Sequence, residues 1–117
     1  MILCIVDDLM FSTKISAAAK AVNAPVSFER QPAAVLERIR AERPSLVIFD
    51  LNAARLAPIE AIRRIKADAE LRGTRTLGYV SHVHADVIAE ARAAGCEEVL
   101  ARSAFSDRLG TILQGAT

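Results

Sequence analysis

Tryptophan is absent from this chain of 117 residues, tyrosine occurs once, and there are only two cysteines. Two cysteines make neither a disulfide framework nor the ligand spacing of a zinc site. Cys4 and Cys96 both lie among apolar neighbours, where a free cysteine behaves as a small hydrophobic residue. We therefore expect a reduced chain in the cytoplasm.

A surplus of charge is also missing, because 15 Lys and Arg residues face 14 Asp and Glu residues and the net charge is +1. This balance gives no electrostatic indication of nucleic-acid or anionic-membrane binding. Long apolar runs are lacking too. The first run, Met1–Val6, ends at Asp7 and is too short for a signal peptide or a membrane span. The protein is expected to act in solution.

What the chain does contain is apolar side chains, which make up 52% of its residues. That content excludes a disordered chain. A chain of this length buries roughly two-thirds of the surface of its unfolded state, so it needs no disulfide or metal to fold. The prediction is one domain over residues 1–117.

Short apolar runs alternate with longer segments that have helical spacing. The runs predicted as strands are Ile2–Val6, Val26–Phe28, Leu46–Phe49, Leu77–Val80 and Val99–Ala101. The first and third are apolar without alternation, which is typical of parallel strands covered on both faces.

Five predicted helices follow these strands, each marked by an apolar stripe. The stripes are Ile15, Ala18, Ala19 and Val22; Val35 and Ile39; Ile59, Ile62 and Ile65; Val87, Ala91 and Ala94; and Leu109, Ile112 and Leu113. We expect Pro44 to stop the second helix, Gly95 to cap the fourth, and Ser106 or Asp107 to open the fifth. The pattern predicts an α/β fold, a doubly wound sandwich with a central parallel sheet.

Polar residues stand where the predicted strands end. Asp7 and Asp8 follow the first strand, Asp50 the third, Ser81 the fourth and Arg102 the fifth. Because the carboxyl ends of parallel strands meet at one edge of the sheet, we expect these side chains to lie close together.

Three neighbouring carboxylates would repel one another unless a cation lay among them. Mg²⁺ suits a site with few protein carboxylates and several retained waters. A hydroxyl and a guanidinium on neighbouring strands would add contacts for a phosphoryl group. The predicted edge therefore indicates a magnesium-dependent phosphoryl site.

The sequence resembles the receiver domain of two-component response regulators over almost its whole length, from Ile2 to Leu113. The matching segments are Ile2–Asp8, Leu46–Asn52, Gly78–Ser81 and Val99–Arg102. The resemblance implies a flavodoxin-like (βα)5 fold with strand order 2-1-3-4-5.

The resemblance also implies the role of each site residue. Asp50 is then the phospho-acceptor, and Asp7, Asp8 and Asp50, with the main-chain carbonyl of Asn52, hold Mg²⁺. Ser81 and Arg102 contact the phosphoryl oxygens. Such a domain is not an enzyme beyond its own phosphorylation and dephosphorylation. Its partners are a histidine kinase or phosphotransfer protein and a downstream protein target, and a homodimer is possible by analogy.

Several positions depart from the family pattern. Arg102 stands in place of a Lys, and a planar guanidinium is not equivalent to a compact ammonium at a phosphate. His82 follows Ser81, where a small residue is usual. The loop Leu51–Ile59 has no Pro at the place where the family usually carries one, and it lacks the usual Asp-Gly turn. These departures leave open whether Asp50 accepts a phosphoryl group.

Two other functions remain open. The first is a pseudo-receiver, an adaptor that binds partners without phosphorylation, in which Arg102 forms a salt bridge with Asp50. The second is a small metal-dependent phosphohydrolase, which would need a general acid beside Asp50. For Asp7 and Asp8 the simplest structural alternative is an acidic turn after a strand.

Overall fold

Strands and helices alternate along the chain in a computed structural model that describes residues 1–81 and 84–116. The strands are β1 (Ile2–Ile5), β2 (Val26–Phe28), β3 (Leu46–Asp50), β4 (Thr76–Val80) and β5 (Glu98–Ala101). The α-helices are α1 (Leu9–Ala21), α2 (Val35–Glu42), α3 (Pro58–Ala67), α4 (Ala85–Ala94) and α5 (Arg102–Gly115). Short 3-10 turns, η1 (Pro32–Ala34) and η2 (Ala54–Leu56), precede α2 and α3.

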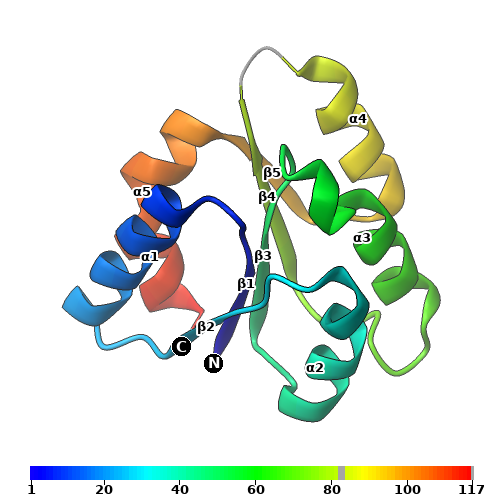
Figure 1. Ribbon diagram of the computed structural model, residues 1–117, viewed down its shortest axis with the longest axis horizontal. Coiled ribbons are helices and arrows are strands. Elements are labelled where there is room, and N and C mark those ends of the chain that lie inside the picture. Colours follow the sequence, from blue (N-terminus) through cyan, green and yellow to red (C-terminus); the bar gives the residue numbers. More distant parts are fainter. Residues whose placement is uncertain (82–83, 117) are drawn as a thin grey trace.

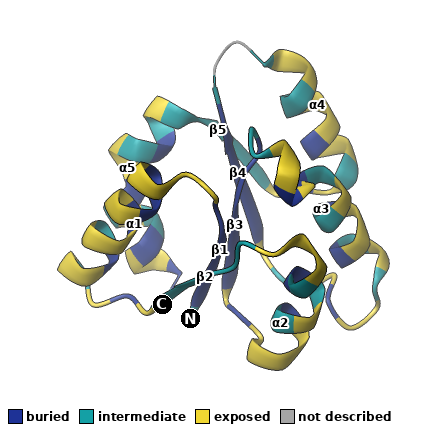
Figure 2. Ribbon diagram, in the orientation of Figure 1, coloured by how far each residue is buried: buried dark blue, intermediate teal, exposed yellow. Residues whose placement is uncertain are grey.

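The five strands form one parallel sheet in the order β2-β1-β3-β4-β5, as expected for a flavodoxin-like (βα)5 fold. Helices α1 and α5 cover one face, and α2, α3 and α4 cover the other (Figure 1). The three central strands are buried on both sides, whereas the helices keep an exposed outer surface (Figure 2). None of the described helices is both long and apolar enough to cross a bilayer.

Alternation along the strands separates two hydrophobic clusters. In β1 and β3 the even-numbered residues, such as Ile48, pack under α1 and α5, and the odd-numbered ones, such as Ile5 and Phe49, pack under α2 and α3. In β4 the numbering is reversed, so that Tyr79 lies on the α1 and α5 side. Asp50, the last residue of β3, continues this alternation after Ile48. Its side chain therefore leaves the sheet on the α1 and α5 side.

Most helix boundaries agree with the sequence prediction. The second helix ends at Glu42, where Arg43 adopts a left-handed conformation before Pro44. Gly95 caps α4 with φ 107°, a conformation that favours glycine.

The start of the fifth helix was predicted wrongly. It begins at Arg102, directly after β5, and not at Ser106 or Asp107. Phe105 is fully buried in this additional first turn, where its ring stacks on Tyr79. Aromatic packing therefore extends the helix upstream, although Ala101 supplies no side-chain cap.

Candidate functional site

The carboxyl edge of the sheet brings the predicted polar residues together. Asp50 ends β3 and lies in register with Tyr79 of β4, and Ser81 follows β4. Arg102 opens α5 directly after β5. Asp7 and Asp8 occupy the connection from β1 to α1.

Asp50 is the most deeply buried of the three acids, with 4% of its surface exposed. Burial raises its pKa above that of an ordinary aspartate, and the charges of Asp8 and Asp7 add to this effect. The N–H of Asn52, which donates to Asp50 Oδ1 at 3.0 Å, and the charge of Arg102 act in the opposite direction. The Asp50 carboxylate is therefore short of compensating positive charge.

We expect Asp50→Asn to raise the free energy of unfolding at neutral pH in metal-free buffer. A raised pKa means that the folded state disfavours the ionised form, so the penalty is complete above that pKa. The penalty is lost below the ordinary pKa of an unfolded aspartate, because both states are then protonated. Urea unfolding over a pH series should therefore show an advantage of the variant that shrinks as the pH falls.

Asp68→Asn is the matched control, and it should behave in the opposite way. Arg40 Nη2 donates to Asp68 Oδ2 at 2.6 Å, and this hydrogen bond lowers the pKa of Asp68. The control should therefore lose stability at neutral pH, with the loss vanishing in acid. An Asp50→Asn protein that is less stable than the parent at neutral pH would contradict the assignment of Asp50 as a penalised buried charge.

Asp8 is the N-cap of α1. Its Oδ1 accepts hydrogen bonds from the N–H groups of Met10 at 2.9 Å and Phe11 at 3.2 Å. These are two of the donors that the first turn of a helix leaves without partners. Asp8, which was predicted as a metal ligand, therefore also stabilises the start of α1.

Asp7 is paired with an arginine that the sequence analysis did not identify. Arg55 Nη2 lies 2.9 Å from Asp7 Oδ1, and Arg55 Nε lies 3.1 Å from Asp7 Oδ2. The hydrogen bond from Arg55 lowers the pKa of Asp7. A basic residue in the loop after Asp50 was the available signal, but residue spacing could not reveal its partner.

The predicted metal ligands have suitable chemistry but are not arranged around a common point. Carboxylate and carbonyl oxygens of Asp7, Asp8, Asp50 and Asn52 are hard donors of the kind Mg²⁺ takes. Nevertheless, residues 1–81 and 84–116 contain no group of three or more His, Cys, Asp or Glu side chains placed to hold a metal ion. The Asn52 side chain accepts the N–H of Ser81 at 2.8 Å, which ties the β3 end to the β4 end. The donor types suit a divalent cation and the buried charge of Asp50, but the acids can gather around one only after Arg55 releases Asp7.

Arg102 does not form the salt bridge with Asp50 that the pseudo-receiver alternative included. None of the ion pairs among the described residues joins Arg102 to Asp50. Instead, the guanidinium lies over the rings of Phe11 and Tyr79, at 5.4 and 5.9 Å from the ring centroids. Arg102 Nε and the Tyr79 hydroxyl are buried without a hydrogen-bond partner among the described residues. Arg102 therefore has donor capacity free for a ligand near Asp50.

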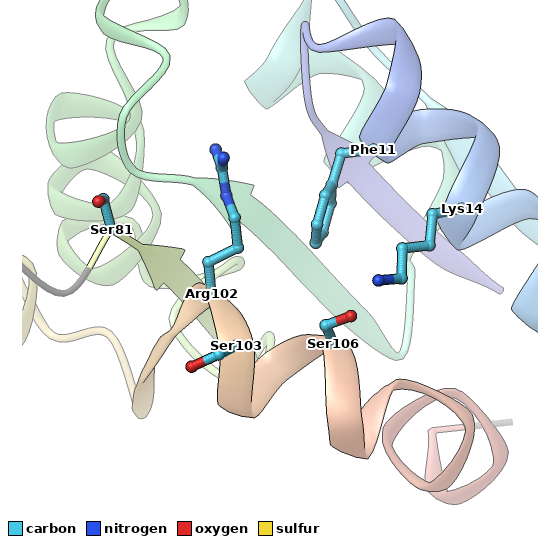
Figure 3. A pocket seen from close by; sticks show the side chains of 6 residues that line it. All are labelled: Phe11, Lys14, Ser81, Arg102, Ser103 and Ser106. Atoms are coloured by element: carbon cyan, nitrogen blue, oxygen red, sulfur yellow. The ribbon is translucent and has the colours of Figure 1, made fainter.

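A cavity of about 350 Å³ opens beside this arginine, between α1 and α5. Its lining consists of Phe11, Lys14, Ser81, Arg102, Ser103 and Ser106. Figure 3 shows the Phe11 ring between Arg102 and Lys14, with Ser81 on the opposite side of Arg102. The lining carries two cations and no acid, so the approach to this part of the edge favours an anion. His82, which stands where a small residue is usual in the family, lies outside the described residues.

Comparison with known proteins shows the same fold in response regulators. No protein-family model and no curated protein sequence matches the chain. The phosphorylated cyanobacterial phytochrome response regulator RcpA is 22% identical, over 97% of this chain and 88% of its own, with a TM-score of 0.81. The Mn²⁺-bound form of the response regulator Rcp1 is 19% identical, over 97% and 88%, with a TM-score of 0.79.

Another response regulator, from Hahella chejuensis, is 17% identical over 98% of this chain and 92% of its own, with a TM-score of 0.86. At these low sequence identities, the comparison shows that the backbone fold is shared. The chain has the fold of response regulator receiver domains, as the sequence resemblance implied.

Proposed function

We propose that the chain is a two-component receiver that takes a phosphoryl group on Asp50 and signals through protein–protein contacts. The observation that carries the proposal is the placement of Asp50. It is a buried carboxylate at the carboxyl edge of the sheet, with Ser81 and Arg102 at the ends of the next two strands. In open α/β sheets this edge is where ligands bind. Similarity of fold to response regulators supports the same function.

The chemistry assigned to Asp50 is an in-line transfer. A carboxylate oxygen forms the new P–O bond while the P–N bond of a phosphohistidine breaks. The imidazole leaves with the electron pair of that bond and takes up a proton. Arg102 favours the ionised carboxylate that the attack requires, because its charge lowers the pKa of Asp50.

Other residues of the edge would hold the phosphoryl group. Arg102 Nε is an unused donor, and the hydroxyl of Ser81 lies at the end of the neighbouring strand. Asp7, Asp8 and Asp50, with the carbonyl of Asn52, would hold a divalent cation, for which we propose Mg²⁺. When bound, it would offset negative charge on the phosphoryl oxygens.

The partners in this proposal are a histidine kinase or phosphotransfer protein and a downstream protein target, all in the cytoplasm. The alternative, a pseudo-receiver adaptor, is favoured by one contact, because the Asp7 carboxylate is already paired with Arg55. The two functions differ in whether Asp50 is ever modified.

Phosphorylation by a small acyl phosphate with Mg²⁺ tests the proposal. Intact-protein mass should increase by one phosphoryl group, and beryllofluoride with Mg²⁺ should change the fluorescence of Tyr79. That residue is the one tyrosine of a chain without tryptophan, and it lies in register with Asp50. The signal therefore reports directly on the site.

Asp50→Asn should abolish both signals, whereas Asp107→Asn, which removes an exposed acid from α5, should leave them unchanged. A complete lack of adduct in the parent protein would contradict the assignment of Asp50 as phospho-acceptor and would favour the pseudo-receiver adaptor. An adduct that persists in Asp50→Asn would place the acceptor elsewhere.

A further inference from the structure

Arg55 links three connections at the carboxyl edge of the sheet. Its guanidinium engages both oxygens of Asp7, and the same Nη2 donates to the carbonyl of Arg30 at 2.9 Å. The three residues follow β3, β1 and β2, respectively. The side chain is thus held at a defined place by a two-pronged ion pair and a main-chain acceptor.

The chain's own arginines already supply positive charge to this edge. Arg55 pairs with Asp7 at 2.9 Å, whereas Arg30 and Arg102 act on Asp7 and Asp50 through their charge alone. Three guanidinium groups therefore stand against the three carboxylates. These charges offset only part of the mutual repulsion of the acids, because no ion pair of the described residues includes Asp50 or Asp8.

A divalent cation and Arg55 cannot use Asp7 at the same time. Both Asp7 oxygens are engaged by the guanidinium, and a cation brought to either oxygen would meet a positive charge at hydrogen-bond distance. From this geometry we propose that Arg55 is a tethered competitor of the divalent cation, which must leave Asp7 before the acid cluster binds metal. The proposal rests on the proposed function, because it takes Asp7 as a metal ligand.

Release of Arg55 is feasible because the pair lies near solvent. The exposed fractions of the side chains are 54% for Arg55 and 39% for Asp7. Water can take over the hydrogen bonds of both groups, and such exposed pairs are individually weak. The competition therefore lowers metal affinity without abolishing it.

Metal binding by Arg55→Gln tests the competition directly. Mn²⁺ and Mg²⁺ would be titrated into the parent protein and the variant by isothermal calorimetry, with the Mn²⁺ electron paramagnetic resonance signal as a second readout. We expect the variant to bind either ion about three- to tenfold more tightly, since an exposed ion pair no longer has to be broken. Arg55→Lys, which keeps the charge but not the fork, should lie between the two.

Arg64→Gln is the matched control. Arg64 is 65% exposed and pairs with Glu60 at 3.1 Å on α3, so its replacement makes the same change in net charge. Its metal affinity should equal that of the parent protein. A gain as large as that of Arg55→Gln would attribute the effect to net charge and overturn the proposal.

The remaining outcomes separate this proposal from the proposed function. Equal affinity in parent and Arg55→Gln, lost in Asp50→Asn, would overturn the competition and leave the metal site standing. Undetectable binding in both proteins would overturn the competition and the metal site together. A loss of stability in Arg55→Gln without a change in metal affinity would also overturn the competition, and it would show that Arg55 only stabilises the loops that it connects.

Discussion

Replacing Phe105 by alanine is expected to lower the free energy of unfolding by about 3–5 kcal/mol, the usual cost of removing a buried aromatic ring. Phe105 is fully buried, and its ring stacks on Tyr79 with a centroid distance of 4.6 Å and an interplanar angle of 12°. Phe11 completes the group, 5.8 Å from Phe105. Loss of the ring leaves a cavity under the first turn of α5, which also carries Arg102. Urea unfolding followed by circular dichroism measures the cost.

Phe105→Leu separates the volume of the ring from its stacking. Leucine fills most of the cavity, so this variant should lose less than about 1.5 kcal/mol. Both variants should alter the fluorescence of Tyr79, because the tyrosine loses its stacked neighbour in each. A cost below about 1 kcal/mol for Phe105→Ala would contradict the packing of α5 on the sheet.

Gly78→Ala is expected to cost about 1–3 kcal/mol, because it overpacks the core beneath the site. A Cβ at position 78 would lie 2.7 Å from Cδ1 and 2.8 Å from Cγ of Leu51. Leu51 is 5% exposed and follows Asp50 directly, so it cannot move into solvent without opening the core. Its displacement would disturb the hydrogen bonds that Asn52 makes with Asp50 and Ser81. Denaturant unfolding gives the cost, and phosphorylation of the variant reports the disturbance.

Gly110→Ala makes the same chemical change with the opposite expected sign. A Cβ there would meet no atom within 4 Å, and the residue lies inside α5. Alanine should therefore stabilise the protein by about 1 kcal/mol. Leu51→Ala in the Gly78→Ala background should show favourable coupling, because it removes the clash. Additive costs in that double variant would mean that Leu51 is not what excludes a side chain at position 78.

The strands could be predicted to within one residue at each end. Runs such as Ile2–Val6 and Leu46–Phe49 are apolar on both faces, and only a sheet covered on both sides satisfies them. The start of α5 could not be predicted in the same way. Capping residues marked Ser106 or Asp107, whereas the helix begins at Arg102 because Phe105 packs against a ring of β4. A contact between distant elements outweighed the local signal.

The candidate site shows the same division. Parallel topology was enough to predict that Asp50, Ser81 and Arg102 follow strands at one edge, since all the carboxyl ends of the strands lie there. It did not predict that Arg102 lies over two aromatic rings and forms no salt bridge with Asp50. It also did not predict the pairing of Asp7 with Arg55, 48 residues further along the chain.

By itself, then, the amino-acid sequence determined the fold and the set of acids at the sheet edge, because apolar periodicity and strand connectivity are properties of the chain that local spacing records. Only the tertiary structure decided which cation each acid meets. Long arginine side chains reach across loops, and their partners depend on where those loops lie in space. The position of the loop that carries Arg55 therefore decides whether the Asp7 carboxylate is free for a metal ion or paired with arginine.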